Sequence, residues 1–187
     1  MIELTPTAAV GADRRSAVLG SALTTFARFG YRKTSMDEVA RSARISRPGL
    51  YFLFASKEEL FRAAVVRGLD KDLVDVERIL GESDQPLAER ILEAFDQWAG
   101  QYIGPMSRDM TALIDDNPEL LGEIVVDRPQ RFADLVTSAF VSSGLSPAAS
   151  TALAQTLIST SIGIKHQARD RASYRERLAV AIELLVR

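Results

Sequence analysis

The residues best suited to contact another molecule lie in the first third of the chain. Arg47, Pro48, Gly49, Tyr51 and Phe52 would form the solvent face of one short helix. An arginine can reach a guanine edge or a phosphate, a tyrosine hydroxyl can donate to a phosphate oxygen, and a phenylalanine can press on a thymine methyl group. This combination predicts contact with double-stranded DNA.

Two further residues stand where a phosphate is favoured. Ser35 and Lys57 lie at the start of predicted helices, where backbone N–H groups and the helix dipole attract an anion. Both are therefore predicted to contact the DNA backbone.

A helix-turn-helix is the element that would position these side chains. The small residue Ala40 allows a second helix to cross at close range, residues 43–45 form the turn, and Ser46 caps the second helix. The angle between the helices would be filled by Val39, Ile45, Leu50 and Leu53. In this arrangement the second helix enters the major groove. The alternative is a plain helical hairpin with no role in DNA binding.

Charge and composition narrow the function classes. The chain of 187 residues has a net charge of −2, but residues 1–62 carry ten Lys/Arg against six Asp/Glu. The N-terminal third is therefore basic and the remainder of the chain acidic. There is no cysteine, no Gly-rich phosphate loop and no metal-ligand spacing, so neither an enzyme nor a cofactor or metal is expected. The N-terminus lacks the pattern of a signal peptide, which predicts a cytoplasmic protein without membrane contact.

The rest of the chain predicts an all-α fold of about nine helices. Apolar residues recur at three- and four-residue spacing, and capping boxes are expected at Ser35, Ser56 and Ser173. Pro129 is expected to kink or split its helix. The predicted helices cover residues 14–29, 36–43, 47–53, 57–80, 86–103, 106–115, 118–142, 147–169 and 174–186.

Residues 29–40 (FGYRKTSMDEVA) and 45–60 (ISRPGLYFLFASKEEL) closely resemble the DNA-binding domain of TetR-family (TetR/AcrR-like) regulators. The resemblance covers roughly residues 12–65. It implies a flexible N-terminus (1–12), a three-helix helix-turn-helix domain (13–62), and a larger helical ligand-binding and dimerisation domain (63–187). It also implies a bacterial homodimer on a palindromic operator, acting as a repressor that a small-molecule effector releases.

The resemblance further assigns roles by matching position. Phosphate contacts would come from Thr34, Ser35, Tyr51 and Lys57, and the base-facing set would be Arg47, Pro48, Gly49 and Phe52. Two positions depart from the family pattern. Arg44 stands where glycine is usual, which would cost about 1 kcal/mol if its backbone is left-handed, and we expect its side chain to reach a phosphate. Gly49 stands where threonine is frequent.

The second domain carries an aromatic and methionine stripe that could line an apolar ligand pocket or simply form core. The candidate pocket residues are Phe95, Trp98, Tyr102, Met106, Met110, Phe132, Phe140, Ile158 and Ile162. The single histidine, His166, is expected to be structural or exposed, with polar ligand contact as the alternative.

The last two predicted helices are apolar on more than one face, which suits a four-helix dimer interface or, alternatively, a monomer core. The candidate interface residues are Leu157, Ser161, Ile164, Lys165, Ala168, Leu178, Ile182 and Leu185. Three functions are weighed: a ligand-released repressor; a DNA-binding dimer whose second domain answers to a protein partner or has no ligand; and a helical enzyme, which nothing in the sequence supports.

Overall fold

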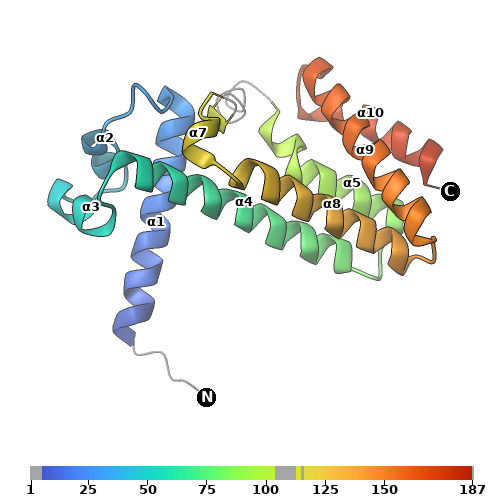
Figure 1. Ribbon diagram of the computed structural model, residues 1–187, viewed down its shortest axis with the longest axis horizontal. Helices are drawn as coiled ribbons and strands as arrows, with labels where there is room; N and C mark the ends of the chain where they lie inside the picture. The colour runs from blue at the N-terminus through green and yellow to red at the C-terminus, as the bar shows by residue number, and fades with distance from the viewer. Residues whose placement is uncertain (1–5, 104–112, 115, 187) are drawn as a thin grey trace. The chain divides into compact units, whose positions relative to one another are not determined.

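The computed structural model describes residues 6–103, 113–114 and 116–186, with side chains from residue 13 onward. These residues form nine α-helices and one 3-10 helix, without a strand (Figure 1), so the all-α prediction is confirmed. They fall into two compact units, residues 1–68 with 112–121, and residues 69–111 with 122–187. The chain therefore passes between the units three times. The predicted domain boundary at residue 62 stays a prediction.

The helices have the following bounds: α1 Pro6–Phe29, α2 Met36–Ser42, α3 Arg47–Leu53, α4 Lys57–Gly81, α5 Leu87–Trp98, η1 Gly100–Tyr102, α7 Pro118–Leu121, α8 Ile124–Ser142, α9 Pro147–Gln167 and α10 Arg171–Leu185. α1 begins at Pro6, eight residues before the predicted start at residue 14, and the flexible N-terminus stays a prediction. Most of the helix predicted over 106–115 lies outside the described residues.

The helix predicted over 118–142 is broken, but not at its proline. α7 ends at Leu121, and Gly122 has a φ of 56°, the left-handed conformation that ends a helix. Pro129 is the sixth residue of α8 and lies inside it. Of the two expectations for Pro129, a split is wrong and a kink stays a prediction; the glycine seven residues earlier ends the helix.

The capping box expected at Ser173 is also misplaced. The N-cap of α10 is Asp170, whose carboxylate accepts from the Ser173 backbone N–H at 2.8 Å, and Ser173 is the third residue of the helix. These hydrogen bonds lower the pKa of the Asp170 carboxyl. The helix begins three residues before the predicted start, because the aspartate satisfies the same backbone donors as a serine would.

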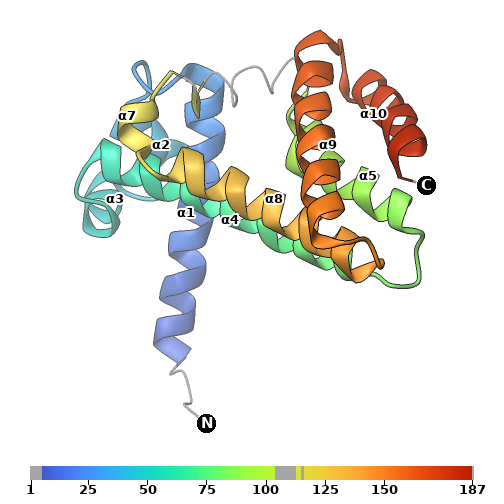
Figure 2. The same ribbon diagram turned by 45° about the vertical axis from the view of Figure 1, so that its right-hand side comes forward.

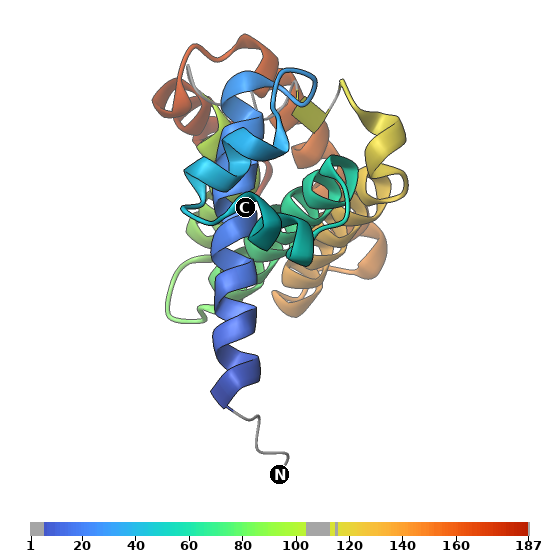
Figure 3. The same ribbon diagram turned by 90° about the vertical axis from the view of Figure 1, so that its left-hand side faces the viewer.

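The first unit is built around an aromatic core. Phe26 of α1 meets Phe61 of α4 edge to face, with ring centroids 5.3 Å apart, and Tyr31 lies 4.8 Å from the same Phe61 ring. Gly68 lets α4 approach α1, because a Cβ there would stand 2.8 Å from Leu23 Cδ2. α2 and α3 lie beside α1, whose N-terminal turns extend beyond them (Figures 1 and 3).

The second unit packs the later part of α4 with α5, α8, α9 and α10. Each of these helices buries residues three or four positions apart, as one apolar face requires. α9 and α10 lie side by side (Figure 2). No described helix is both long and apolar enough to span a membrane.

Candidate nucleic-acid interface

Two caps set the positions of α2 and α3. The Ser35 hydroxyl accepts from the Glu38 backbone N–H, and Glu38 Oε2 accepts in return from the Ser35 backbone N–H at 2.7 Å. This capping box, confirmed as predicted, lowers the pKa of the Glu38 carboxyl through the hydrogen bonds from Ser35. Ser46 caps α3 by accepting from the Gly49 backbone N–H at 3.1 Å.

The turn between the two helices is a Schellman motif centred on Arg44. Its φ is 55°, its N–H donates to the Arg41 carbonyl, and the next N–H, of Ile45, donates to the Ala40 carbonyl at 3.0 Å. The backbone of Arg44 is therefore left-handed, which is the condition under which a residue other than glycine has a cost at this position. Ala40 and Leu50 are buried where the helices meet. The helix-turn-helix geometry therefore follows from local hydrogen bonds and one apolar contact zone.

α3 presents a largely exposed outer face. Phe52 is 89% exposed and Tyr51 43%, so two neighbouring aromatic side chains of α3 face solvent. Arg47 and Pro48 are also exposed, whereas Gly49 is half-buried. A Cβ at Gly49 would lie 3.0 Å from Ser46 Oγ, so a side chain there would crowd the N-cap hydroxyl.

Two residues predicted to contact phosphates are used inside the first unit instead. Thr34 is 2% exposed, and its hydroxyl donates to the Gly30 carbonyl at 2.9 Å. Lys57 Nζ donates to the carbonyls of Tyr31 and Thr34 at 3.0 and 3.1 Å, and lies 4.4 Å from the Tyr31 ring centroid. Both side chains thus hold the loop after α1 against the start of α4. The expectation that the Thr34 hydroxyl faces the DNA is wrong.

Arg47 forms an ion pair that was not predicted from the sequence. Its Nε lies 3.0 Å from Asp37 Oδ1 on α2, and its Cζ lies 5.7 Å from the ring centroid of Tyr51, one turn along α3. The Arg47 side chain nevertheless stays 63% exposed. Asp37 and Arg47 are ten positions apart, beyond the range of helix-periodicity rules, so only the folded turn brings them together.

The predicted pocket stripe is largely core. Phe95 and Phe132 meet edge to face at 5.0 Å, and Trp98 stacks on Phe132 at 5.1 Å. Phe140 is also buried in this cluster, and Ile158 packs at its edge. Ile162 is 52% exposed, which contradicts its assignment to a pocket. Met106 and Met110 lie outside the described residues.

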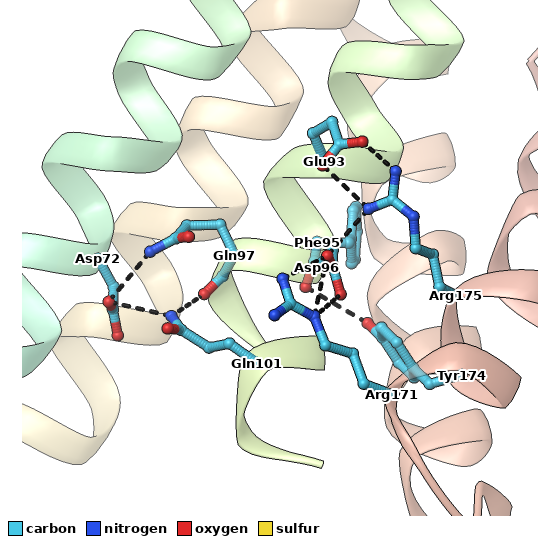
Figure 4. Close-up of polar contacts among 9 residues, drawn as sticks. All are labelled: Asp72, Glu93, Phe95, Asp96, Gln97, Gln101, Arg171, Tyr174 and Arg175. Atoms are coloured by element: carbon cyan, nitrogen blue, oxygen red, sulfur yellow. Dashed lines mark hydrogen bonds and ion pairs between the residues drawn. The ribbon is translucent and has the colours of Figure 1, made fainter.

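Two buried carboxylates in the second unit were not predicted (Figure 4). Asp72 of α4 is 3% exposed and accepts from the Tyr102 hydroxyl and from Gln101 Nε2 at 3.1 Å. Burial raises the pKa of the Asp72 carboxyl. Asp96 of α5 is 2% exposed and pairs with two arginines of α10, Arg171 and Arg175. Tyr102, expected to line a pocket, is thus bound to Asp72.

Most of the predicted dimer residues are also buried within the single chain. Leu157, Ile164, Leu178 and Ile182 belong to the core of the second unit, and Ser161 exchanges a 2.7 Å hydrogen bond with Tyr174. These assignments are wrong because a stripe at helical spacing faces the helix's own core first. Lys165 and Ala168 are half-buried, and Leu185 is 41% exposed. The exposed large apolar residues of α9 and α10 are Ile162, Val180, Leu184 and Leu185.

His166 lies exposed in the last turn of α9. Within the part of the chain that the structure describes, no group of three or more His, Cys, Asp or Glu residues could hold a metal ion.

The fold and the exposed face of α3 define a class, the all-helical proteins with an N-terminal helix-turn-helix. Residues 18–64 match the family model described as bacterial regulatory proteins, tetR family. This match covers 47 of the 187 residues and identifies the helix-turn-helix region of the chain as similar to that of tetR-family regulators. The family and the relatives compared below are described as regulators rather than enzymes.

Curated relatives match mainly in the first unit. The chain is 42% identical over 62 residues to the HTH-type transcriptional regulator YfiR of Bacillus subtilis, covering 33% of this chain and 30% of YfiR. It is 27% identical over 128 residues to the HTH-type transcriptional regulator RutR of Escherichia coli K12, covering 58% and 60% of the two chains. The alignments thus span less than two thirds of either relative.

Solved structures share the whole fold. A TetR-family transcriptional regulator from Mesorhizobium loti superimposes with a TM-score of 0.77 at 20% identity, covering 94% of this chain and 96% of the other. Reduced NemR of Escherichia coli gives a TM-score of 0.73 at 19% identity, covering 92% and 97%. At this identity the likeness concerns the fold alone.

Proposed function

We propose that this protein is a transcriptional repressor that binds a two-fold symmetric DNA operator as a homodimer and is released by a small, mostly apolar ligand. The observation that carries the DNA-binding part is the outer face of α3. Phe52 is 89% exposed on the same short helix on which the guanidinium of Arg47 lies 5.7 Å from the ring centroid of Tyr51. An aromatic tip, a cation and a phenol on one short helix can contact thymine methyl, guanine and phosphate.

The dimer is proposed to form through the exposed faces of α9 and α10. Ile162 on α9 and Val180 and Leu184 on α10 are each more than half exposed, although the opposite faces of both helices are fully packed. A second copy of the chain would cover these side chains in a four-helix arrangement. Two α3 helices could then read successive major grooves about 34–36 Å apart.

The path of the chain supports control of the first unit by the second. Residues 112–121 lie between elements of the second unit in sequence but pack within the first, where Arg62 donates to the Leu120 carbonyl at 3.3 Å. The same segment helps to line an open cleft of about 390 Å³ against the loop after α1. A ligand that favours one arrangement of the second unit would therefore act on the first through several covalent links.

A specific observation favours the second candidate function, a DNA-binding dimer without a ligand. Phe95, Phe132 and Phe140 are packed as core, so these three residues of the predicted pocket have no free face to offer. A screen of apolar compounds by thermal shift separates the candidates. Stabilisation together with release from DNA supports the ligand-released repressor, and stabilisation by no compound supports the ligand-free dimer.

The DNA-binding proposal is tested by selection of duplexes from a random-sequence library, followed by fluorescence anisotropy at several salt concentrations. We expect a two-fold symmetric site, nanomolar affinity and a steep salt dependence. Phe52→Ala should weaken binding to the selected site at least tenfold, whereas Val74→Ala, at a 62% exposed apolar position on α4, should leave it unchanged. Equal binding to selected and scrambled duplexes would contradict the proposal.

A further inference from the structure

The ion pair between Asp37 and Arg47 joins the two helices of the helix-turn-helix on its exposed side. Asp37 lies in the first turn of α2, and Arg47 is the first residue of α3. Oδ1 of Asp37 is shielded from solvent and has no hydrogen-bond partner among the described residues, so the 3.0 Å approach of Arg47 Nε is its compensation. Arg47 thus compensates the charge of a shielded carboxylate oxygen, and Asp37 in turn restrains the Arg47 side chain.

This pairing leaves a particular part of the guanidinium available. The carboxylate faces Nε, on the side of the guanidinium group, and Tyr51 lies 5.7 Å away along α3. The two terminal Nη groups are the donors that can reach guanine O6 and N7 together. An arginine already fixed in one orientation loses less side-chain freedom when it forms these two bonds.

The Asp37 carboxylate also lowers affinity for DNA sequences that lack the guanine. The Asp37 side chain is 48% exposed and lies 3.0 Å from Arg47, which belongs to the α3 face that we assign to DNA. A negative charge at this place repels phosphates, so it opposes a non-specific contact between Arg47 and the DNA backbone more than a contact between Arg47 and a guanine edge. It therefore lowers affinity for DNA that gives Arg47 no guanine, and discrimination between sequences rises.

We propose that Asp37 is a positioning residue for specificity, which holds Arg47 so that it reads one guanine in each half of the operator. This inference rests on the proposed function of α3. Asp37 itself contacts no base. Its effect on recognition passes through Arg47.

The test compares wild type with Asp37→Asn and Arg47→Ala on the duplex selected by wild type. In a series of duplexes, each guanine of the selected site is replaced, one per duplex, by 7-deazaguanine, which lacks the N7 acceptor. At one position we expect wild type to lose about tenfold in affinity and Asp37→Asn less than threefold, with binding to scrambled DNA unchanged or tighter. Arg47→Ala should be insensitive at the same position, and the double variant should match Arg47→Ala.

Glu58→Gln is the matched control, because it removes one exposed carboxylate from the same unit without touching Arg47. It should change affinity for all duplexes by the same factor and leave the 7-deazaguanine effect intact. Circular dichroism checks that each variant is folded. A wild-type loss at 7-deazaguanine that Asp37→Asn retains within twofold overturns the inference alone. Selection of no sequence by wild type overturns the proposed function and the inference together.

Discussion

At the scale of single residues, the turn of the helix-turn-helix carries an identifiable cost. Arg44 is the one described residue other than glycine with a positive φ, and it ends α2 with both hydrogen bonds of the Schellman motif. A side chain in the left-handed region costs about 1 kcal/mol relative to glycine. A contact between the Arg44 guanidinium and the DNA backbone would explain why this position holds an arginine although glycine would be more stable.

Replacing Arg44 separates the two effects. Arg44→Gly should raise the free energy of unfolding by about 1 kcal/mol and weaken DNA binding about threefold to tenfold, since strain and charge are both removed. Arg44→Ala keeps the Cβ and should weaken DNA binding equally without stabilising the fold. Urea denaturation and anisotropy give the two quantities. Tighter DNA binding by Arg44→Gly would refute the phosphate contact.

The exposed face of α3 could be predicted because it depends on spacing within seven residues. The roles of Thr34 and Lys57 could not, because the Lys57 ammonium binds carbonyls 23 and 26 positions earlier in the chain. Both are polar residues next to a predicted DNA surface, and sequence alone does not distinguish a free ammonium from one that already holds a loop. Asp37 was missed for the same reason, since its partner lies on another helix.

At the scale of helices, α5 and α10 are joined by charge as well as by apolar contact. Asp96 accepts from Arg171 Nη2 at 2.7 Å and from Arg175 Nη1 at 2.9 Å, and Arg175 also pairs with Glu93 (Figure 4). The hydrogen bonds to Asp96 raise the pKa of Arg171, and those to Glu93 raise that of Arg175. A Cβ at Gly100 would stand 2.1 Å from Asp96 Oδ1, so glycine is required there.

Removing the Asp96 carboxylate should weaken this contact substantially. We expect Asp96→Asn to lower the free energy of unfolding by about 2 kcal/mol, less than for a fully buried pair because both arginines keep access to water. Glu93→Gln, at the more exposed end of the network, should cost less than 1 kcal/mol. Equal losses in urea denaturation would show that burial of Asp96 is not what matters.

Asp72 should make stability depend on pH. Its folded-state pKa is raised by burial, so as pH rises above about 3.8 the unfolded carboxyl ionises first, and stability is lost until the pH passes the folded pKa. Asp72→Asn removes this loss. The gain in unfolding free energy of the variant over wild type should be larger at pH 7.5 than at pH 4.5. An equal difference at both pH values would contradict this account.

Local periodicity was enough to predict that these segments are helical. It did not predict two boundaries, the break at Gly122 and the start of α10 at Arg171. The helix ends at Gly122 and continues through Pro129, because the proline removes a single i→i−4 hydrogen bond of α8, whereas the left-handed glycine reverses the backbone. The pocket stripe was ambiguous in principle, since core and cavity use the same apolar residues at the same spacing. Only the contacts of Phe132 with Phe95 and Trp98 show that these positions are packed.

At the scale of the whole molecule, the proposed dimer can be tested apart from DNA. Leu184 on α10 is 62% exposed, and a glutamate there would bury a charge in the interface. Leu184→Glu should raise the dimer dissociation constant at least tenfold in sedimentation velocity. Val126→Glu, at a 67% exposed position on α8, should leave the dimer intact. The same loss in both variants, or a monomeric wild type, would contradict the assigned interface.

The threefold passage of the chain between its two units also limits how such a protein can be recombined. A gene fusion that transfers residues 1–68 to a foreign sensing domain leaves residues 112–121 behind. Leu113 and Leu121, 3% and 0% exposed, would then be missing, and the apolar surface that they cover would face water. A working chimera must carry both stretches or redesign the surface beneath them. Residues 112–121 therefore have to be transferred together with residues 1–68, although they are far from them in the sequence.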